Sequence, residues 1–287
     1  MKNIINSKIT TRFGTAGTGK THTIKKIYDE KKKAGDHARV FSFSRNGVKD
    51  YGDNGSTIHS QCSSLLGIGG IFDDNETRFM PQRELYQLYK YTSGIEQTND
   101  EDRDDLLYHR ALDKSMLGVS KGMWDTMRNY YMFDAFEWDP ISGHCVPDCD
   151  ALCWMYDELV KSHNGHLPSY SQKCGLDGKY RSDELTVDMF IKCVKYYEGW
   201  KRHEGYIDYT DILINSYISP MRPSENCVII DEAHDLTPLQ YNIVSKWIAH
   251  DDVSSAYIFG DVAQMIFSWM GSSSKAYLEM IGGTVIG

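Results

Sequence analysis

The sequence lacks the long apolar runs and the leader segment that membrane and secreted proteins carry. No stretch approaches the roughly 18 consecutive apolar residues of a membrane-spanning helix. The stretch from Met1 to Ser7 contains no apolar leader core. Cysteine is sparse and odd in number, 7 in 287 residues, which argues for reduced thiols rather than a disulfide framework. We therefore expect a cytoplasmic protein with no membrane partner.

An excess of basic residues is also missing. Lys and Arg number 31 against 40 Asp and Glu, a formal net charge of −9 at pH 7, whereas nucleic-acid binders usually carry a basic surface. Net charge is a weak criterion, because binding depends on the local surface. Acidic residues crowd into 100–105 and lysines into 25–33, although such a lysine cluster is more often a solvated helix face than a DNA contact. Charge alone neither supports nor excludes a nucleic-acid partner.

Short apolar runs typical of strands occur toward both ends of the chain. They are Ile9–Phe13, Ala38–Phe43, Cys227–Asp231, Ala256–Gly260 and Thr284–Ile286. Segments with helical periodicity, such as Thr237–Ala249, separate several of them. Strands that alternate with helices predict an α/β fold, with a parallel sheet covered on both faces.

The middle of the chain has few strand signals and several helix-like segments. These segments cover residues 80–91, 103–117, 150–163 and 184–197. An α/β core of this kind needs about 150 residues, so we interpret the surplus as an inserted, mostly α-helical subdomain. The expected boundaries are 1–70 and 203–287 for the core and 71–202 for the insertion.

The most specific motif is a complete G-x-x-x-x-G-K-[ST] phosphate-binding loop. Its residues are Gly14, Thr15, Ala16, Gly17, Thr18, Gly19, Lys20 and Thr21. A strand-like run precedes the loop and a helix-like run follows it, so backbone N–H groups are expected to cradle phosphates at the helix N-terminus. Lys20 then reaches the terminal phosphates, and Thr21 offers its hydroxyl to Mg²⁺. The alternative, a flexible Gly/Thr turn, is disfavoured by the flanking elements.

Two adjacent carboxylates follow the strand-like run that starts at Cys227. Asp231 is placed to hold Mg²⁺, directly or through water, and Glu232 to orient or deprotonate a water that attacks the γ-phosphate. The alternative is a charged cap on the following helix, a role open to Asp235 before Pro238. Capping by Asp235 leaves the Asp231–Glu232 pair available for catalysis.

A third segment, Gly260 to Trp269, again follows a strand-like run. Gln264 can bond the γ-phosphate or the attacking water, which couples the nucleotide to neighbouring aromatic residues. Phe267 and Trp269 lie two positions apart in an expected loop, where a ring can stack on an unpaired base. The alternative is that the Trp side chain belongs to the core, as is usual in globular proteins.

In this order the motifs resemble the UvrD/Rep-like branch of superfamily 1 DNA helicases, over about half of the chain. Segments 38–48, 57–60 and 207–213 are similar to further stretches of that family. The resemblance implies a RecA-like core, ATP and Mg²⁺ as cofactors, and single-stranded DNA as a partner. It also implies that a DNA track is lined by five residues, Phe43, Ser44, His59, Phe267 and Trp269.

The chain departs from the family pattern at several positions. His234 stands where the pattern usually has Gln, and Met270 where it often has Arg. No Gln precedes Gly14, so the adenine-reading residue is missing and weak discrimination among bases is expected. The arginines of the family's second motor domain would follow Gly287. Because such arginines account for about 10³–10⁵ in rate, we expect slow hydrolysis by this chain alone and a second motor domain or subunit as partner.

Other functions remain open at this point. The chief competitor is a nucleotide-binding switch or assembly module whose helical insertion binds a protein partner. A small-molecule kinase is disfavoured, because the acidic pair and the later Gly-Asp-x-x-Gln segment suit attack by water.

Candidate ligands for Zn²⁺ or a cluster occur in the middle of the chain, namely His144, Cys145, Cys149 and Cys153. Their spacing lacks a pair two residues apart, and simple packing of the thiols is the favoured alternative.

Overall fold

The computed structural model describes residues 9–13, 19–68, 114–162, 186–204 and 207–261. The chain divides into two compact units, one formed by residues 1–69 and 212–287 and the other by residues 70–211. Among the described helices, none has the length and apolar character needed to cross a lipid bilayer.

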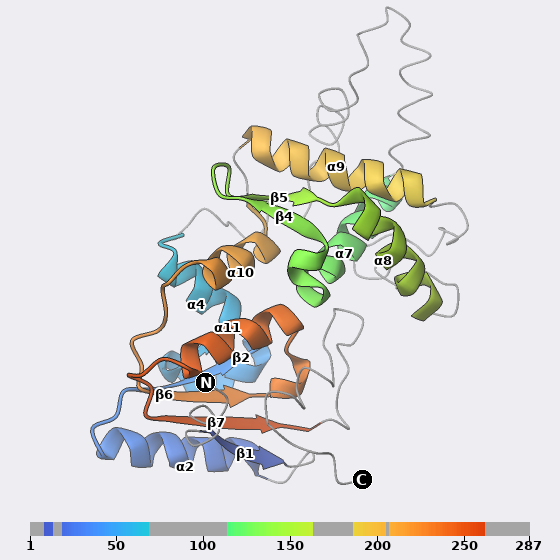
Figure 1. The fold of residues 1–287 in the computed structure, drawn as a ribbon. Helices are drawn as coiled ribbons and strands as arrows, with labels where there is room; N and C mark the ends of the chain where they lie inside the picture. The colour runs from blue at the N-terminus through green and yellow to red at the C-terminus, as the bar shows by residue number, and fades with distance from the viewer. Residues whose placement is uncertain (1–8, 14–18, 69–113, 163–185, 205–206, 262–287) are drawn as a thin grey trace, which may run out of the picture. The chain divides into compact units, whose positions relative to one another are not determined.

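The first unit contains a five-stranded, wholly parallel sheet (Figure 1). Its strand order is β1-β7-β6-β2-β3, with the bounds β1 Ile9–Phe13, β7 Ser255–Gly260, β6 Cys227–Asp231, β2 Ala38–Ser42 and β3 Gly55–Thr57. The parallel sheet and α/β class predicted from the sequence are confirmed. β3 was not predicted, and the run Thr284–Ile286 lies outside the described residues.

Helices cover both faces of this sheet. The helices of the first unit are α2 Lys20–Lys33, α3 Arg45–Val48, α4 Ile58–Leu65, α11 Pro238–Ile248 and most of α10 Tyr209–Ile218, with 3₁₀ turns η1 Lys49–Asn54 and η4 Ala233–Asp235. Of these, α2 and α11 cover the two faces. Val40 packs in one cluster with Ile24 of α2, while its neighbour Phe41 packs on Trp247 of α11 with ring centroids 5.4 Å apart. Because adjacent strand residues point to opposite faces, α2 and α11 lie on opposite sides of the sheet (Figure 1).

The second unit is mainly helical. It contains α7 Lys114–Tyr130, η2 Met132–Asp134, β4 Phe136–Asp139, β5 His144–Pro147, α8 Cys149–Ser162 and α9 Val187–Glu204. The helix expected over 150–163 corresponds to α8, and the one expected over 184–197 corresponds to α9, which continues to Glu204. β4 and β5 form an antiparallel hairpin that was not predicted. The expected helix at 80–91 and most of that at 103–117 lie outside the described residues.

Candidate nucleotide-binding site

The motif residues meet at one edge of the parallel sheet. Ser42 of β2 is paired with Asp231 of β6 and with Thr57 of β3, and Gly260 of β7 is paired with Phe13 of β1. The chain therefore leaves all five strands at the same edge. Ligands of open parallel sheets bind beyond this carboxyl edge, which is where the sequence motifs begin.

The described end of the phosphate loop has the expected form. Gly19 adopts a left-handed conformation with φ 78°, which glycine reaches without steric cost. Helix α2 starts at the next residue, Lys20, so its unpaired N–H groups face the end of the loop. Residues 14–18, the remainder of the loop, lie outside the described residues.

Lys20 and Glu232 meet although 212 positions separate them. Lys20 Nζ lies 3.0 Å from Glu232 Oε2, and their side chains are 12% and 32% exposed. Glu232 itself has φ 52°, an uncommon conformation for a residue other than glycine. Strained backbone of this kind, at about 1–3 kcal/mol, occurs preferentially at functional sites. The lysine of the phosphate loop and the adjacent carboxylates Asp231 and Glu232 thus lie together at the carboxyl edge of the sheet.

Asp231 ends the buried strand β6 and is held by two hydrogen bonds. The backbone N–H of Glu232 donates to its Oδ1 at 2.9 Å, and the Tyr51 hydroxyl donates to its Oδ2 at 2.6 Å. Burial raises the pKa of Asp231, although the Tyr51 hydrogen bond opposes this shift. Tyr51 was missed from the sequence, because nothing in its local pattern indicates a contact 180 positions away.

His234 links the segment Asp231–Asp235, which we call the acidic turn, to the end of β7. Its buried Nδ1 accepts the backbone N–H of Asp261 at 3.1 Å, which assigns the proton of the neutral ring to Nε2. The same Nδ1 lies 3.5 Å from Glu232 Oε2. Asp261 begins the segment that contains Gln264, Phe267 and Trp269, and these three predicted site residues lie outside the described residues.

The alternative role of Asp235 as a helix cap is wrong. Thr237 is the N-cap of α11: its hydroxyl accepts the N–H of Gln240, and the Gln240 side chain accepts the N–H of Thr237. Asp235 instead lies buried in η4. Burial, together with the negative charge of Glu232, raises the pKa of Asp235 to about 7.

The other predicted DNA contacts follow β2 and β3 at the same edge. Phe43 is half-buried, and Ser44 caps α3 by accepting the N–H of Gly47 at 3.2 Å. His59 is the second residue of α4, and its Nδ1 lies 3.4 Å from Gln240 Nε2. Burial lowers the pKa of His59 to about 4, so the ring is neutral at physiological pH.

The cysteine segment does not gather ligands in the described part of the chain. Cys145 is buried in β5, whereas Cys153 is exposed on α8. Within the described residues, the side chains close enough to share an ion are instead Glu198, Asp208 and Asp211. These three carboxylates are already bonded to buried cations, which makes them an ion-pair cluster rather than a metal site.

The cations of this cluster are Arg128 of α7 and Lys201 of α9. Arg128 bonds Asp208 and Asp211 at 2.7 and 2.8 Å. Lys201 bonds Asp208 at 2.9 Å, Asp211 at 2.7 Å and Glu198 at 2.9 Å. Burial opposes the charge of Asp208, yet Arg128 and Lys201 hold its pKa well below its usual range. Within the second unit, Asp208 and Asp211 therefore link α7 and α9 through buried ion pairs.

Comparison with known proteins assigns the family. The model of the UvrD/REP helicase N-terminal domain matches residues 52–282. The chain belongs to this helicase family. The match contains the acidic turn and the segment 207–213, whereas the phosphate loop precedes it. The resemblance inferred from the motifs is thus confirmed, and the assignment of the loop rests on its own residues.

Individual relatives of this UvrD/REP-family chain are more distant. Proteins named ATP-dependent DNA helicase UvrD2, from Mycobacterium bovis and Mycobacterium tuberculosis, are 27% identical to it over 112 residues. The aligned part is 34% of this chain and 16% of each relative. The chain thus matches about a sixth of the length of these helicases.

Proposed function

We propose that this chain is an ATP-hydrolysing motor part of a DNA helicase or translocase, which binds Mg-ATP and single-stranded DNA. The observation that carries the proposal is the Lys20–Glu232 pair at the carboxyl edge of the sheet. Membership of the UvrD/REP family supports the same activity. Phosphate binding and activation of water need a lysine and a carboxylate around one triphosphate.

The side chains present fit a magnesium nucleotide. Asp231 and Thr21 offer a carboxylate and a hydroxyl oxygen, the ligand types that Mg²⁺ prefers. Asp231 ends β6 and Thr21 lies in the first turn of α2. We assign the ion to these two residues and the phosphates to residues 14–21. When bound, Mg²⁺ neutralises charge on the transferring phosphoryl group.

Glu232 is the proposed base that activates water. In the structure Lys20 Nζ donates a hydrogen bond to the Glu232 carboxylate at 3.0 Å, which occupies one of the two carboxylate oxygens. A triphosphate that attracts Lys20 would leave Glu232 available to orient a water molecule. The pair therefore couples occupancy of the phosphate loop to activation of the base, with Gln264 proposed as the residue that senses the γ-phosphate.

The test is phosphate release by the purified chain with and without a single-stranded oligonucleotide. DNA should stimulate release, and Lys20→Ala should abolish it. Glu232→Gln should retain nucleotide binding while lowering turnover by about 10²–10⁴-fold. Lys26→Ala is the matched control, because Lys26 lies on the same helix but forms only an exposed pair with Glu30.

A nucleotide-dependent assembly module is the second candidate. The observation that favours it is a pair of exposed aromatic side chains in the second unit, Tyr130 and Trp154, whose rings both contact that of Tyr131 with centroids 5.0 and 5.2 Å apart. Exposed apolar side chains that lie together are typical of protein docking. Turnover that DNA fails to stimulate, even with a second motor domain supplied in trans, would favour this candidate over the motor.

A further inference from the structure

Tyr51 contacts one of the two residues assigned to Mg²⁺. It lies in η1, and its side chain is 7% exposed. The hydroxyl donates to Asp231 Oδ2 at 2.6 Å. This hydrogen bond connects η1 with the end of β6, 180 positions further along the chain.

The fold fixes the position of this hydroxyl. The ring of Tyr51 packs in a cluster with Ile24 of α2, Val40 of β2 and Ile229 of β6. The backbone at Gly55 also packs closely against Tyr51. A Cβ added at Gly55 would lie 3.1 Å from the Tyr51 Cβ and 3.0 Å from the Val48 Cβ. Packing and the turn around Tyr51 thus hold the phenol in place, and its hydroxyl points to Asp231 at the carboxyl edge of the sheet.

We propose that Tyr51 is a positioning residue, which holds the Asp231 carboxylate in the orientation that receives the magnesium ion of Mg-ATP. This inference rests on the proposed function. Glu232 N–H orients one carboxylate oxygen and Tyr51 orients the other. Each carboxylate oxygen accepts more than one hydrogen bond or ligand, so both retain capacity for the ion or for its bound water.

The effect of Tyr51 is predicted to be specific to the ion. Groups that hydrogen-bond a metal ligand fix its orientation, and their loss typically costs about 10–100-fold in metal affinity. Tyr51→Phe removes only the hydroxyl and keeps the ring in its cluster. The variant should therefore fold normally and should bind nucleotide without Mg²⁺ as the wild-type protein does.

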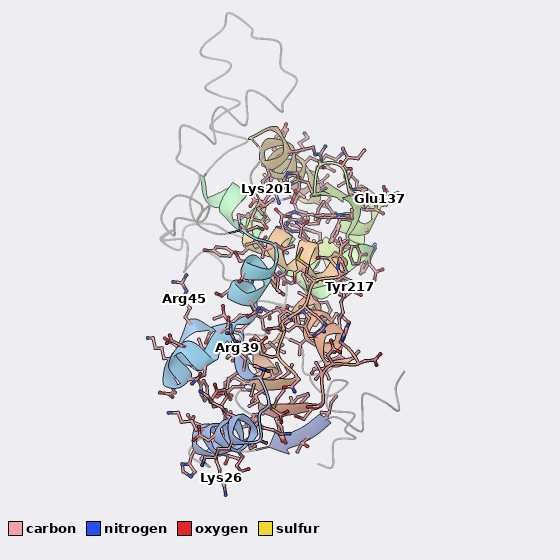
Figure 2. All side chains as sticks on the ribbon, turned by 90° about the vertical axis from the view of Figure 1, so that its left-hand side faces the viewer. Lys26, Arg39, Arg45, Glu137, Lys201 and Tyr217 are labelled. Atoms are coloured by element: carbon pink, nitrogen blue, oxygen red, sulfur yellow. The ribbon has the colours of Figure 1, made fainter. Side chains whose placement is uncertain are left out.

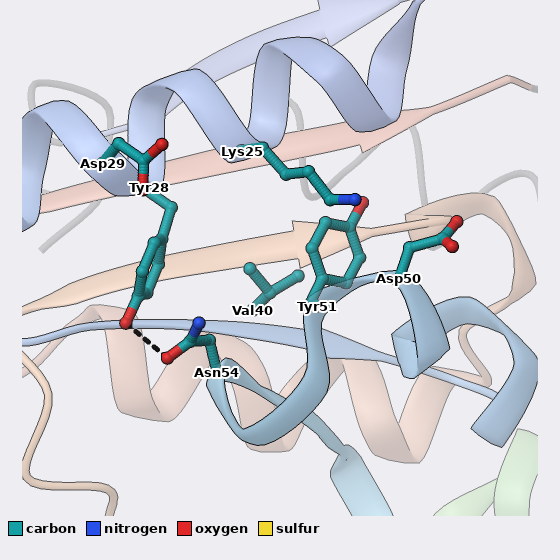
Figure 3. A pocket seen from close by; sticks show the side chains of 7 residues that line it. All are labelled: Lys25, Tyr28, Asp29, Val40, Asp50, Tyr51 and Asn54. Atoms are coloured by element: carbon teal, nitrogen blue, oxygen red, sulfur yellow. Dashed lines mark hydrogen bonds between the residues drawn. The ribbon is translucent and has the colours of Figure 1, made fainter.

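The experiment is a titration of the full chain with a fluorescent ATP analogue, at increasing Mg²⁺ and in EDTA. Tyr51→Phe should shift the Mg²⁺ midpoint about 10–100-fold upward and leave the affinity in EDTA unchanged. Tyr28→Phe is the matched control. Tyr28 lines the same pocket of about 200 Å³ as Tyr51, but its hydroxyl bonds Asn54 at 2.7 Å instead of Asp231 (Figure 3).

Two results would overturn the inference while leaving the proposed function standing. One is an unchanged Mg²⁺ midpoint in Tyr51→Phe. The other is a lower midpoint, which would mean that the hydroxyl competes with the ion. A wild-type protein that binds no nucleotide would instead contradict the proposed function, and the role of Tyr51 with it.

A double-mutant cycle tests whether Tyr51 acts through Asp231. In an Asp231→Ala background, Tyr51→Phe should cause no further shift of the Mg²⁺ midpoint, because the group that it positions is absent. A second, independent shift would show that Tyr51 acts on the ion by another route and would overturn the positioning role. Melting curves of each variant check that the fold is retained.

Discussion

Burial governs the charge of the side chains around the acidic turn. Lys20 and Glu232 neutralise each other across 3.0 Å, whereas Asp235 is buried near the negative charge of Glu232. This combination raises the pKa of Asp235 to about 7, far above the usual value near 4 for an aspartate. At pH 6 the folded protein therefore holds a proton on Asp235 that the unfolded chain releases.

This proton gives a pH-dependent contribution to stability. Between about pH 4 and 7 the folded state binds more protons at Asp235 than the unfolded state, so this contribution to the free energy of unfolding falls as pH rises. Asp235→Asn removes the contribution. The stability of the variant relative to wild type should therefore increase from pH 5 to pH 8, with an upper limit of about 4 kcal/mol for a shift of about three pKa units.

Urea unfolding of both proteins at several pH values measures this difference. Asp252→Asn is a suitable control, because the Asp252 side chain is 66% exposed and its loss should change stability little at any pH. A difference between Asp235→Asn and wild type that stays constant from pH 5 to pH 8 would contradict the raised pKa.

Single residues were predictable from sequence where a motif fixes their chemistry. Lys20 and Glu232 were expected to share one site, and the structure places them in contact. Tyr51 and the hydrogen bond from Asp261 to His234 were not foreseen. Both contacts depend on how distant segments pack, which a linear pattern does not encode.

At the scale of elements, buried charges join α7, α9 and the start of α10. Arg128 of α7 is fully buried. It forms ion pairs with a carboxylate from each of the other two helices, Asp211 of α10 and Glu198 of α9. Removing one partner of a buried ion pair leaves uncompensated charge and is costly. The second unit should therefore depend on Arg128 more than on any exposed ion pair.

Arg128→Met should lower the free energy of unfolding by about 3–5 kcal/mol, because the buried carboxylates would keep only Lys201 as a fully buried cation. The measurement is thermal or urea unfolding followed by circular dichroism. Lys26→Met is the control, since the Lys26–Glu30 pair is exposed and such pairs contribute at most about 1 kcal/mol. Equal effects of the two substitutions would contradict a structural role for the cluster.

Elements were predictable where periodicity extends over several residues. The four described sheet strands with apolar runs were identified from the sequence, but β3 was not. β3 consists of Gly55-Ser56-Thr57, which has no apolar pattern and pairs only with β2 at the edge of the sheet. The β4–β5 hairpin was missed because its strands have only four residues each, too few for a clear alternation.

At the scale of the whole chain, family membership and net charge give opposing indications about DNA. The UvrD/REP family match covers residues 52–282, yet the formal net charge is −9. A negative chain repels DNA at long range, so binding must come from a local surface. We therefore expect few phosphate contacts and a larger share of base stacking at the predicted aromatic residues.

Salt dependence of DNA affinity distinguishes these contributions. For single strands, each neutralised phosphate contributes about −0.7 to the slope of log affinity against log salt. Three or four contacts predict a slope of about −2 to −3, which fluorescence anisotropy with a labelled oligo-dT between 50 and 300 mM NaCl can measure. A much steeper slope would contradict binding dominated by stacking.

Arg45 is the residue through which this expectation can be tested directly. It is exposed at the start of α3, directly after Phe43 and Ser44, and projects away from the ribbon (Figure 2). If its guanidinium contacts a phosphate, Arg45→Ala should make the slope shallower by about 0.7. Lys26→Ala should leave the slope unchanged, because Lys26 lies well into α2, away from the strand ends where the proposed DNA contacts begin. Equal slopes in wild type and Arg45→Ala would place the DNA track away from α3. Phe43 and Ser44, which directly precede α3, would then not be DNA contacts.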